Sequence, residues 1–152
     1  MSKGTAGSGN GAAFRLARTV KWGDCDPAGI IYTPRVLDYA METLEAWNRE
    51  VLGIPWIKLN REMSLGMPTV RAELDFMGAP APDEEVVTEL RVERVGRSSI
   101  TFQITGEDRD GRALFRVSVT SCVIARPAFK STPIPEAILE RIHDYRKACG
   151  EP

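Results

Sequence analysis

The period of the hydrophobic pattern changes once along the chain, and this change restricts the possible folds more than any other feature. Apolar residues first recur at helical spacing, at Leu37, Met41, Leu44, Trp47 and Val51, with Ala40 beside them. From residue 66 onward, apolar and polar residues alternate instead, as in strands with one buried face. Four segments show this alternation: Val70, Ala72, Leu74 and Phe76; Val86, Thr88, Leu90 and Val92; Ile100, Phe102 and Ile104; Phe115, Val117, Val119 and Val123. One long helix therefore has to cover the apolar face of a sheet.

The connections between these segments predict an antiparallel sheet. Three connections resemble those of hairpins: a loop from Gly78 to Asp83, a turn at Gly96, and Asp110-Gly111. A further strand is predicted from Phe14 to Lys21, before the long helix, and a terminal helix from Pro135 to Ala148. The sequence thus predicts an α+β fold, with a five-stranded antiparallel sheet wrapped around one long helix, plus a C-terminal helix.

Turn-forming residues bound the long helix. Thr33 is predicted as its N-cap and Pro34 as its first helical residue. Gly53 is expected to end the helix, and Pro55-Trp56 can begin a short second one.

Length and composition narrow the class of protein. The 152 residues are most simply one domain, over residues 14–149, preceded by a Gly/Ser-rich stretch, 1–13, that we expect to be a flexible arm. A net charge of −1 provides no basic field for nucleic acid, and no apolar run approaches the roughly 18 residues of a membrane-spanning helix. The three cysteines, Cys25, Cys122 and Cys149, form no metal-ligand pattern and suggest a reducing cytoplasm.

A turn-rich stretch, residues 22–32, joins the first strand to the long helix and contains Asp24 and Asp26. Pro27 biases Asp26 toward extended geometry, and Gly29 can adopt a positive φ at no steric cost. Asp26 is therefore expected near the N-terminus of the following helix, where an anion is favoured. A polar turn whose aspartates cap backbone N–H groups would use the same residues, so the spacing leaves both interpretations open.

Asp26 has the chemistry of a catalytic group. With a reference pKa of about 3.9 it is ionised at neutral pH, and a carboxylate can attack an activated acyl group or act as a base toward water. Either route needs donors for the developing oxyanion, and the start of the helix offers free N–H groups. Pro34 has none, so the Thr33 N–H is the donor left for substrate when the Thr33 hydroxyl caps a later N–H. Asp24 is interpreted as a structural acceptor within the loop.

Cys25 is a weaker candidate for the nucleophile. The pKa of a free cysteine is about 8.5, and two adjacent carboxylates should raise it. The one histidine, His143, falls on the predicted terminal helix, so a Cys-His or Ser-His pair has little support.

Basic and hydroxyl side chains follow the turn at Gly96. Arg97, Ser98 and Ser99 offer donors that suit phosphate groups, although a solvated charged hairpin explains them equally well. Lys130 is a weaker candidate of the same kind. No Walker-type loop or dinucleotide glycine pattern occurs, so a nucleotide would have to be bound by such dispersed groups.

The segment from Gly23 to Ile30, GDCDPAGI, closely resembles the active-site loop of the 4-hydroxybenzoyl-CoA thioesterase family, which has the hot-dog fold. Further resemblance follows in the same order at residues 52–56, 66–70, 96–99 and 134–136. Together these segments span the chain from Arg18 to the C-terminal helix.

This resemblance implies a cytoplasmic acyl-CoA thioesterase in which Asp26 is the catalytic carboxylate and the Thr33 backbone N–H polarises the thioester carbonyl. It implies that the side chains that bind substrate or the CoA phosphates are Tyr32, Thr69, Arg97, Ser98, Ser99 and Lys130. It also implies homodimers, often paired as homotetramers, with active sites built across the subunit interface. No metal or redox cofactor is expected, since CoA is part of the substrate.

One departure from the family's pattern affects the acyl group. The aromatic-specific enzyme continues its loop with Trp then Tyr, where this chain has Tyr32 then Thr33, so the aromatic side chain nearest the acyl group is altered.

Two alternative functions are a hot-dog hydratase or dehydratase and a non-catalytic acyl-CoA-binding protein. The first generally relies on a histidine with a carboxylate, and the second would normally need a DNA-binding segment, whereas residues 1–13 contain one basic residue, Lys3.

Overall fold

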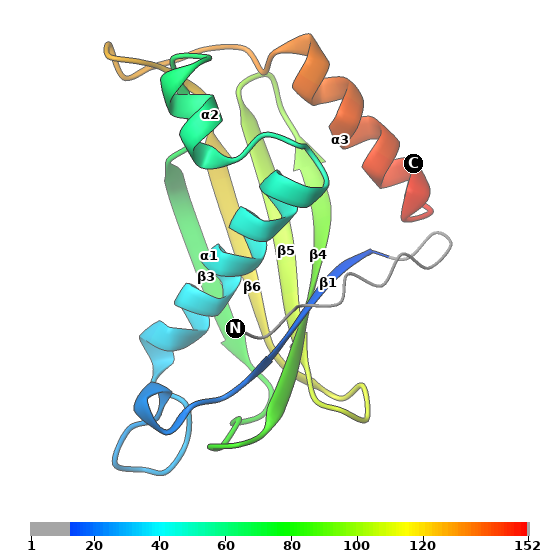
Figure 1. The fold of residues 1–152 in the computed structure, drawn as a ribbon. Helices are drawn as coiled ribbons and strands as arrows, with labels where there is room; N and C mark the ends of the chain where they lie inside the picture. The colour runs from blue at the N-terminus through cyan, green and yellow to red at the C-terminus, as the bar shows by residue number, and fades with distance from the viewer. Residues whose placement is uncertain (1–12, 152) are drawn as a thin grey trace.

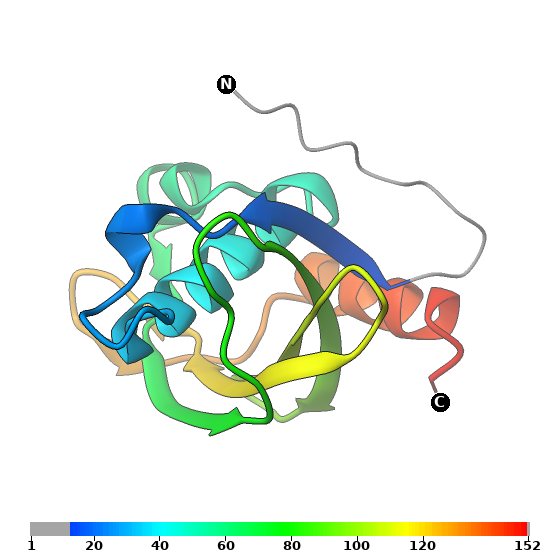
Figure 2. The ribbon, with the colours of Figure 1, turned by 90° about the horizontal axis from the view of Figure 1, so that it is seen from below.

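The long predicted helix is α1, Thr33–Glu50, and it lies against a five-stranded antiparallel sheet in the computed structural model, which describes residues 13–151 (Figure 1). The strands of this sheet are β1 (Phe14–Thr19), β3 (Thr69–Phe76), β4 (Glu85–Val95), β5 (Ser99–Glu107) and β6 (Ala113–Cys122). Seen from below, the sheet curves around α1, which lies inside the curve (Figure 2). The predicted α+β architecture is therefore confirmed. The predicted arm, apart from Ala13, lies outside the described residues.

Shorter elements complete the fold. They are the 3-10 turn η1 (Trp22–Asp24), α2 (Trp56–Arg61), β2 (Leu65–Gly66), β7 (Ile124–Ala125), β8 (Lys130–Ser131) and the terminal helix α3 (Glu136–Ala148). β2, β7 and β8 form a small second sheet that was not predicted, because strands of two residues are too short to show alternation. None of the helices within residues 13–151 combines the length and apolar character needed to cross a membrane.

The strand order β1-β4-β5-β6-β3 shows that one of the three predicted hairpins is wrong. β4, β5 and β6 are joined by hairpins, but β3 pairs with β6, so residues 77–84 cross the end of the sheet to reach β4. Hydrogen bonds from distant segments hold this crossing. Met77 and Gly78 both donate to the Leu114 carbonyl, each at 2.8 Å, and Ile31 donates to the Pro80 carbonyl at 2.8 Å. Such long-range bonds leave no local signal in the sequence.

The buried face of α1 is rotated from the predicted apolar stripe. Its fully buried residues are Val36, Tyr39, Ala40, Thr43, Leu44, Trp47 and Asn48. Leu37, Met41 and Val51, which belong to the predicted stripe, are only partly buried. Thr43 and Asn48 are tolerated inside because each side chain donates to a carbonyl four residues earlier, at 2.7 and 3.0 Å. A pattern of apolar residues alone could not include these two polar positions.

The edge strand β3 is more exposed than its alternating pattern predicted. Every residue of β3 except Leu74 is exposed, and Val70 and Phe76 are 61% and 45% exposed. β3 pairs only with β6, and its other edge has no partner within residues 13–151. An edge strand with exposed apolar side chains is a template for pairing with another chain.

Tyr145 links α3 to both β1 and β4. Its nearly buried hydroxyl accepts a hydrogen bond from the Phe14 N–H at 2.8 Å and donates one to the Leu90 carbonyl at 2.5 Å. We expect Tyr145→Phe to lower the free energy of unfolding by about 1–3 kcal/mol, because both bonds are lost in a buried setting. Denaturant titration measures this change. The exposed Tyr32 is the matched control: Tyr32→Phe should leave the stability unaltered, and an equal loss in both variants would contradict the prediction.

Candidate active site

Residues 22–32 fold into a loop that closes on itself directly before α1. Its first turn is η1, and the Gly29 N–H donates to the Asp26 carbonyl at 2.9 Å. Gly29 has a φ of +79°, the conformation predicted for it. The Tyr32 N–H donates to the Asp24 carbonyl at 2.8 Å, so the two ends of the loop are joined where the helix begins.

Asp26 lies half-buried in this loop. Its Oδ1 accepts a hydrogen bond from the Ala28 N–H at 2.8 Å, which is the local turn that an aspartate before Pro and Gly commonly makes. Within residues 13–151, no group donates a hydrogen bond to its Oδ2. The two interpretations of the sequence are therefore compatible, since one oxygen stabilises the turn while the other is free to meet a substrate.

The predicted N-cap is wrong by one residue. α1 begins at Thr33 itself, with Tyr32 as the N-cap and Pro34 as the second helical residue. The reason is that the Tyr32 N–H is bonded to the Asp24 carbonyl, while the Tyr32 carbonyl accepts a hydrogen bond from the Arg35 N–H at 2.8 Å. Thr33 thus occupies the first helical position, where the backbone N–H has no partner inside the helix. It also donates to no other acceptor within the described part of the chain.

Asp24 is held from three directions. Its Oδ2 accepts hydrogen bonds from the Tyr39 hydroxyl at 2.6 Å and from the Lys21 N–H at 3.2 Å, and its Oδ1 lies 3.8 Å from Arg35 Nε. Burial by itself would raise the pKa of Asp24, but the hydrogen bonds from Tyr39 and Lys21 and the charge of Arg35 together lower it. Asp24 is therefore a charged acceptor whose side chain is only 15% exposed, as its structural interpretation requires.

Cys25 and His143 lack the features of a nucleophile and its base. Desolvation and the adjacent charges of Asp24 and Asp26 raise the pKa of the Cys25 thiol, in the predicted direction. The thiol is therefore protonated at neutral pH, whereas only the thiolate is a strong nucleophile. His143 is exposed on α3.

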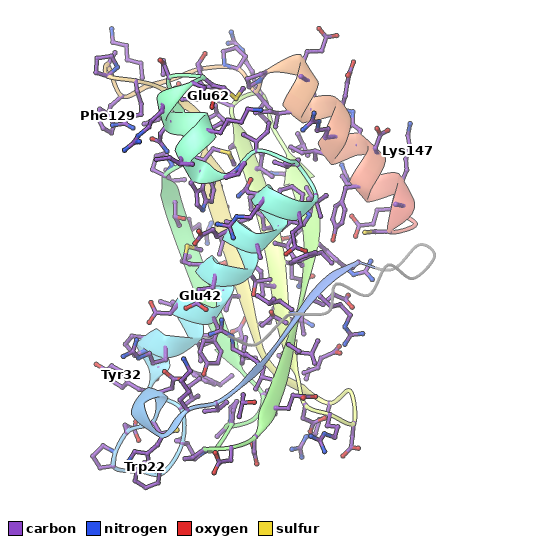
Figure 3. All side chains as sticks on the ribbon, viewed as in Figure 1. Trp22, Tyr32, Glu42, Glu62, Phe129 and Lys147 are labelled. Carbon is purple, nitrogen blue, oxygen red and sulfur yellow. The ribbon has the colours of Figure 1, made fainter. Side chains whose placement is uncertain are left out.

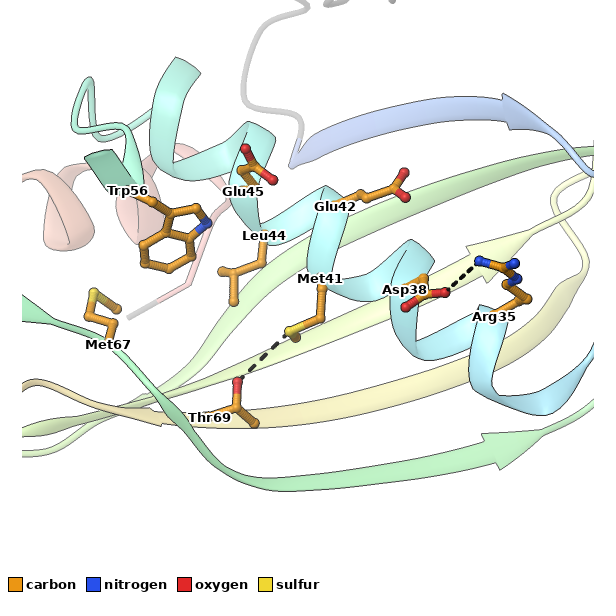
Figure 4. Close-up of a pocket in the computed structure, with 9 residues that line it drawn as sticks. All are labelled: Arg35, Asp38, Met41, Glu42, Leu44, Glu45, Trp56, Met67 and Thr69. Carbon is orange, nitrogen blue, oxygen red and sulfur yellow. Dashed lines mark hydrogen bonds and ion pairs between the residues drawn. The ribbon is translucent and has the colours of Figure 1, made fainter. Parts of the chain in front are cut away.

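A groove of about 500 Å³ runs along α1 from its first turn to α2 (Figure 4). Its apolar lining is Met41, Leu44, Trp56 and Met67; its polar lining is Arg35, Thr69 and the carboxylates of Asp38, Glu42 and Glu45. Thr69, at the start of β3, lies across the groove from α1, with its Oγ1 3.8 Å from the Met41 sulfur. Arg35 lies at the end nearest the Asp24 carboxylate, so the groove starts beside the first turn of α1.

The segments that carry the predicted CoA-binding residues lie at the other end of the sheet from the loop of residues 22–32 (Figure 1). Arg97 and Ser98 form the β4–β5 turn, Ser99 begins β5, and Lys130 begins β8. Tyr32 marks the opposite end, at the start of α1 (Figure 3). One chain therefore places Asp26, Tyr32 and Thr33 in the loop and the helix start at one end of the sheet. The four basic and hydroxyl residues lie on segments at the other end.

Sequence reasoning missed Tyr39 and Arg35 as residues of the site. Four residues apart, they share one face of α1, which the sequence could reveal. That this face meets Asp24 depends on tertiary structure and carries no sequence signal. No group of three or more His, Cys, Asp and Glu side chains that could hold a metal ion occurs within residues 13–151.

Comparison with known proteins identifies the family of this chain. The sequence profile of the Thioesterase-like superfamily matches residues 20–142. A 1,4-dihydroxy-2-naphthoyl-CoA hydrolase from Rippkaea orientalis (strain PCC 8801 / RF-1) is 26% identical over 126 residues, covering 81% of this chain and 90% of the relative.

Two solved structures extend the comparison. A thioesterase superfamily protein from Jannaschia sp. CCS1 is 32% identical with a TM-score of 0.81, covering 95% of this chain and 96% of that one. A Staphylococcus aureus protein solved in complex with CoA has a TM-score of 0.84 at 14% identity, covering 92% and 86%, and shows likeness of fold alone. With a profile match over most of its length and the hot-dog architecture, the chain belongs to the thioesterase-like superfamily.

Proposed function

We propose that this protein is an acyl-CoA thioesterase, which hydrolyses the thioester of an acyl-CoA to a free acid and CoA. One observation carries the proposal: the unbonded Oδ2 of Asp26 and the open Thr33 N–H belong to the same closed loop and helix start. A carboxylate and an oxyanion donor can together hydrolyse a thioester without a metal.

Asp26 acts as the nucleophile or as the general base. As the nucleophile, its Oδ2 attacks the thioester carbonyl, the C–S bond breaks, CoA leaves as the thiolate, and water cleaves the resulting anhydride. As the base, Asp26 takes a proton from the water that attacks the carbonyl. In both routes the negative charge on the carbonyl oxygen is stabilised by the Thr33 N–H and by the positive end of the α1 dipole.

The acyl group is proposed to be aromatic and to lie in the groove along α1. The R. orientalis relative is named for an aromatic substrate, 1,4-dihydroxy-2-naphthoyl-CoA, which supports this class. The apolar lining of Met41, Trp56 and Met67 suits a planar ring, and about 500 Å³ is a usual size for a small-molecule site. Tyr32 and Thr69 are proposed to contact the acyl group from the helix start and from β3.

CoA is proposed to be bound by a second copy of the chain. The β4–β5 turn, the start of β5 and β8 carry Arg97, Ser98, Ser99 and Lys130, and they lie at the opposite end of the sheet from the loop of residues 22–32 (Figure 1). We therefore propose that they serve the Asp26 of another copy. Antiparallel pairing of two β3 edges across a two-fold axis would bring the Asp26 end of one copy to the CoA-binding end of the other. Homodimers are therefore part of the proposal, and pairing of dimers into homotetramers stays a prediction.

The cellular setting follows from the same proposal. We place the enzyme in the cytoplasm, where acyl-CoA substrates need no export and where the three free cysteines remain reduced. No cofactor enters the proposed chemistry.

The experiment that tests this function is a screen of aromatic, short-chain and long-chain acyl-CoAs, with release of the CoA thiol as the readout. Fastest release from aromatic acyl-CoAs is the expected result. Saturable binding of acyl-CoA without thiol release would instead indicate a non-catalytic acyl-CoA-binding protein. Addition or loss of water across an enoyl-CoA would indicate a hydratase.

Arg97→Ala is expected to raise KM for acyl-CoA by about tenfold with a smaller effect on kcat, because a phosphate contact far from the thioester contributes mainly uniform binding. Steady-state kinetics with acyl-CoA and with N-acetylcysteamine thioesters, which lack the nucleotide, measure this. The matched control is Arg109→Ala, at an exposed arginine of the β5–β6 turn, which should leave KM unaltered. Equal losses with both kinds of thioester would contradict the assignment of Arg97.

A further inference from the structure

Tyr39 connects the buried face of α1 to the loop that carries Asp26. Its side chain is 2% exposed, and its hydroxyl donates to Asp24 Oδ2 at 2.6 Å. The residue lies two turns into α1, so this hydrogen bond joins the loop to a rigid part of the helix rather than to its first turn. Asp26 follows Asp24 by two residues, in a loop whose tip from Pro27 to Ile30 is exposed.

We propose that Tyr39 is a positioning residue, which fixes Asp26 relative to the Thr33 N–H by holding the Asp24 carboxylate. This inference rests on the proposed function, in which Asp26 is the catalytic group. Tyr39 itself contacts neither substrate nor reacting atoms, and it acts through Asp24.

The geometry supplies the connection from Tyr39 to the catalytic pair. Asp24 is bound at both of its polar ends, with its carboxylate on Tyr39 and its carbonyl on the Tyr32 N–H at 2.8 Å. Tyr32 is the N-cap that precedes Thr33, so Asp24 sets both the start of the helix and the path of the chain into Asp26. Displacing the Asp24 carboxylate would therefore move the two groups relative to each other.

Among residues 13–151, Tyr39 is the one buried side chain that bonds to the Asp24 carboxylate. Arg35 also approaches Asp24, but at 3.8 Å and from a side chain that is 48% exposed, so water can compete with it. Backbone groups also hold the loop: the Lys21 N–H donates to Asp24 Oδ2 at 3.2 Å, and the Asp26 N–H donates to the Ile30 carbonyl at 3.0 Å. Beyond the exposed tip, the N–H of the buried Ile31 donates to the Pro80 carbonyl. Tyr39 is thus the buried side chain that holds the Asp24 side of the loop.

The ring of Tyr39 is also held by a contact on one of its faces. The Arg18 guanidinium lies 3.8 Å from the ring centroid and is bound by the Glu42 carboxylate. Burial and the hydrogen bond to Asp24 raise the pKa of the Tyr39 hydroxyl, which keeps it protonated and able to donate at neutral pH. A hydroxyl held in this way is a more rigid anchor than a solvent-exposed ion pair.

Tyr39→Phe tests the inference by removing one oxygen atom. We expect kcat to fall by about tenfold with KM nearly unaltered, because a small misplacement of a catalytic group reduces the rate of the chemical step while the binding contacts persist. The matched control is Tyr145→Phe, which removes a buried, doubly bonded tyrosine hydroxyl at α3. Tyr145→Phe should lose stability and keep its kcat.

Hydrogen exchange gives a readout that does not depend on activity. Backbone amides of residues 22–33 should exchange faster in Tyr39→Phe than in the parent protein, with no such change in Tyr145→Phe. Normal kcat in Tyr39→Phe, or exchange of residues 22–33 that matches the parent, overturns the positioning role. A fully active Asp26→Asn variant would instead overturn the catalytic role of Asp26, so the two failures are distinguishable.

Discussion

Asp26→Asn is expected to lower kcat for acyl-CoA hydrolysis by at least about two orders of magnitude, the lower range for losing a positioned base. Asparagine keeps the shape of the side chain and an acceptor for the Ala28 N–H, but it removes the charge and most of the nucleophilicity. Binding of acyl-CoA should persist, because the Thr33 N–H and the phosphate contacts are untouched. Thiol release measures turnover, and calorimetry with a non-hydrolysable acyl-CoA analogue measures binding.

Cys25→Ser is the control for this variant, since it alters the neighbouring residue of the same loop. Most activity should remain, because the pKa of the Cys25 thiol is raised and the thiol plays no part in the proposed chemistry. Both variants must first be shown to form the parent oligomer. Near-normal turnover in Asp26→Asn would falsify the catalytic assignment, and loss of turnover in Cys25→Ser alone would assign the chemistry to the cysteine.

Val70→Asp is expected to separate the dimer and abolish most acyl-CoA hydrolysis at micromolar protein concentration. Val70 is 61% exposed on the edge strand β3, and pairing across a two-fold axis would bury the new charge near its symmetry mate. Like charges brought together at an interface cost several kcal/mol, which corresponds to a dissociation constant raised by at least about a hundredfold. Light scattering measures the mass. The matched control is Ala17→Asp on the other edge strand, β1, which should remain dimeric.

A monomeric parent protein at micromolar concentration would contradict both the assembly and the shared site. The shared site has its own test in mixtures of two impaired variants. When Asp26→Asn is mixed with Arg97→Glu, one site of each mixed dimer carries both defects and the other carries neither, so activity should rise above that of either variant. Sites contained within one chain would give no recovery.

The parts of the fold that the sequence predicted are those governed by burial within one chain. β4, β5 and β6 alternate because one face meets α1, and their inward residues, such as Phe102, are fully buried. β3 alternates in the same way, yet Val70 is exposed. The alternation predicts a buried face, but no other segment of residues 13–151 covers the Val70 side chain. The crossing by residues 77–84 was missed because bonds to distant groups, such as the Leu114 carbonyl, select it over a hairpin.

The candidate site likewise has one part that the sequence predicted and one part that it did not. The loop with Asp26, Gly29 and Thr33 was predicted because its residues are contiguous and each has a local conformational reason to be there. The bond from Tyr39 to Asp24 joins residues of two elements whose relative placement only the fold decides. The exact start of α1 depends on the backbone bonds of Tyr32 to Asp24 and Arg35, which the residue types do not reveal, so the N-cap was predicted one residue late.

Carboxylates line the groove, and their negative charge is expected to affect the release of the product. Three carboxylates and one guanidinium line the groove, and Arg35 pairs with Asp38 at 3.2 Å. Glu42 and Glu45 pair with Arg18 and Arg49, which lie outside the lining, so the surface that faces the groove carries more negative than positive groups. A thioester enters with an uncharged acyl group, but its hydrolysis creates a carboxylate anion beside these side chains. Electrostatic repulsion then favours departure of the free acid over its retention. Product inhibition should accordingly be weak, and it should strengthen as salt screens the repulsion.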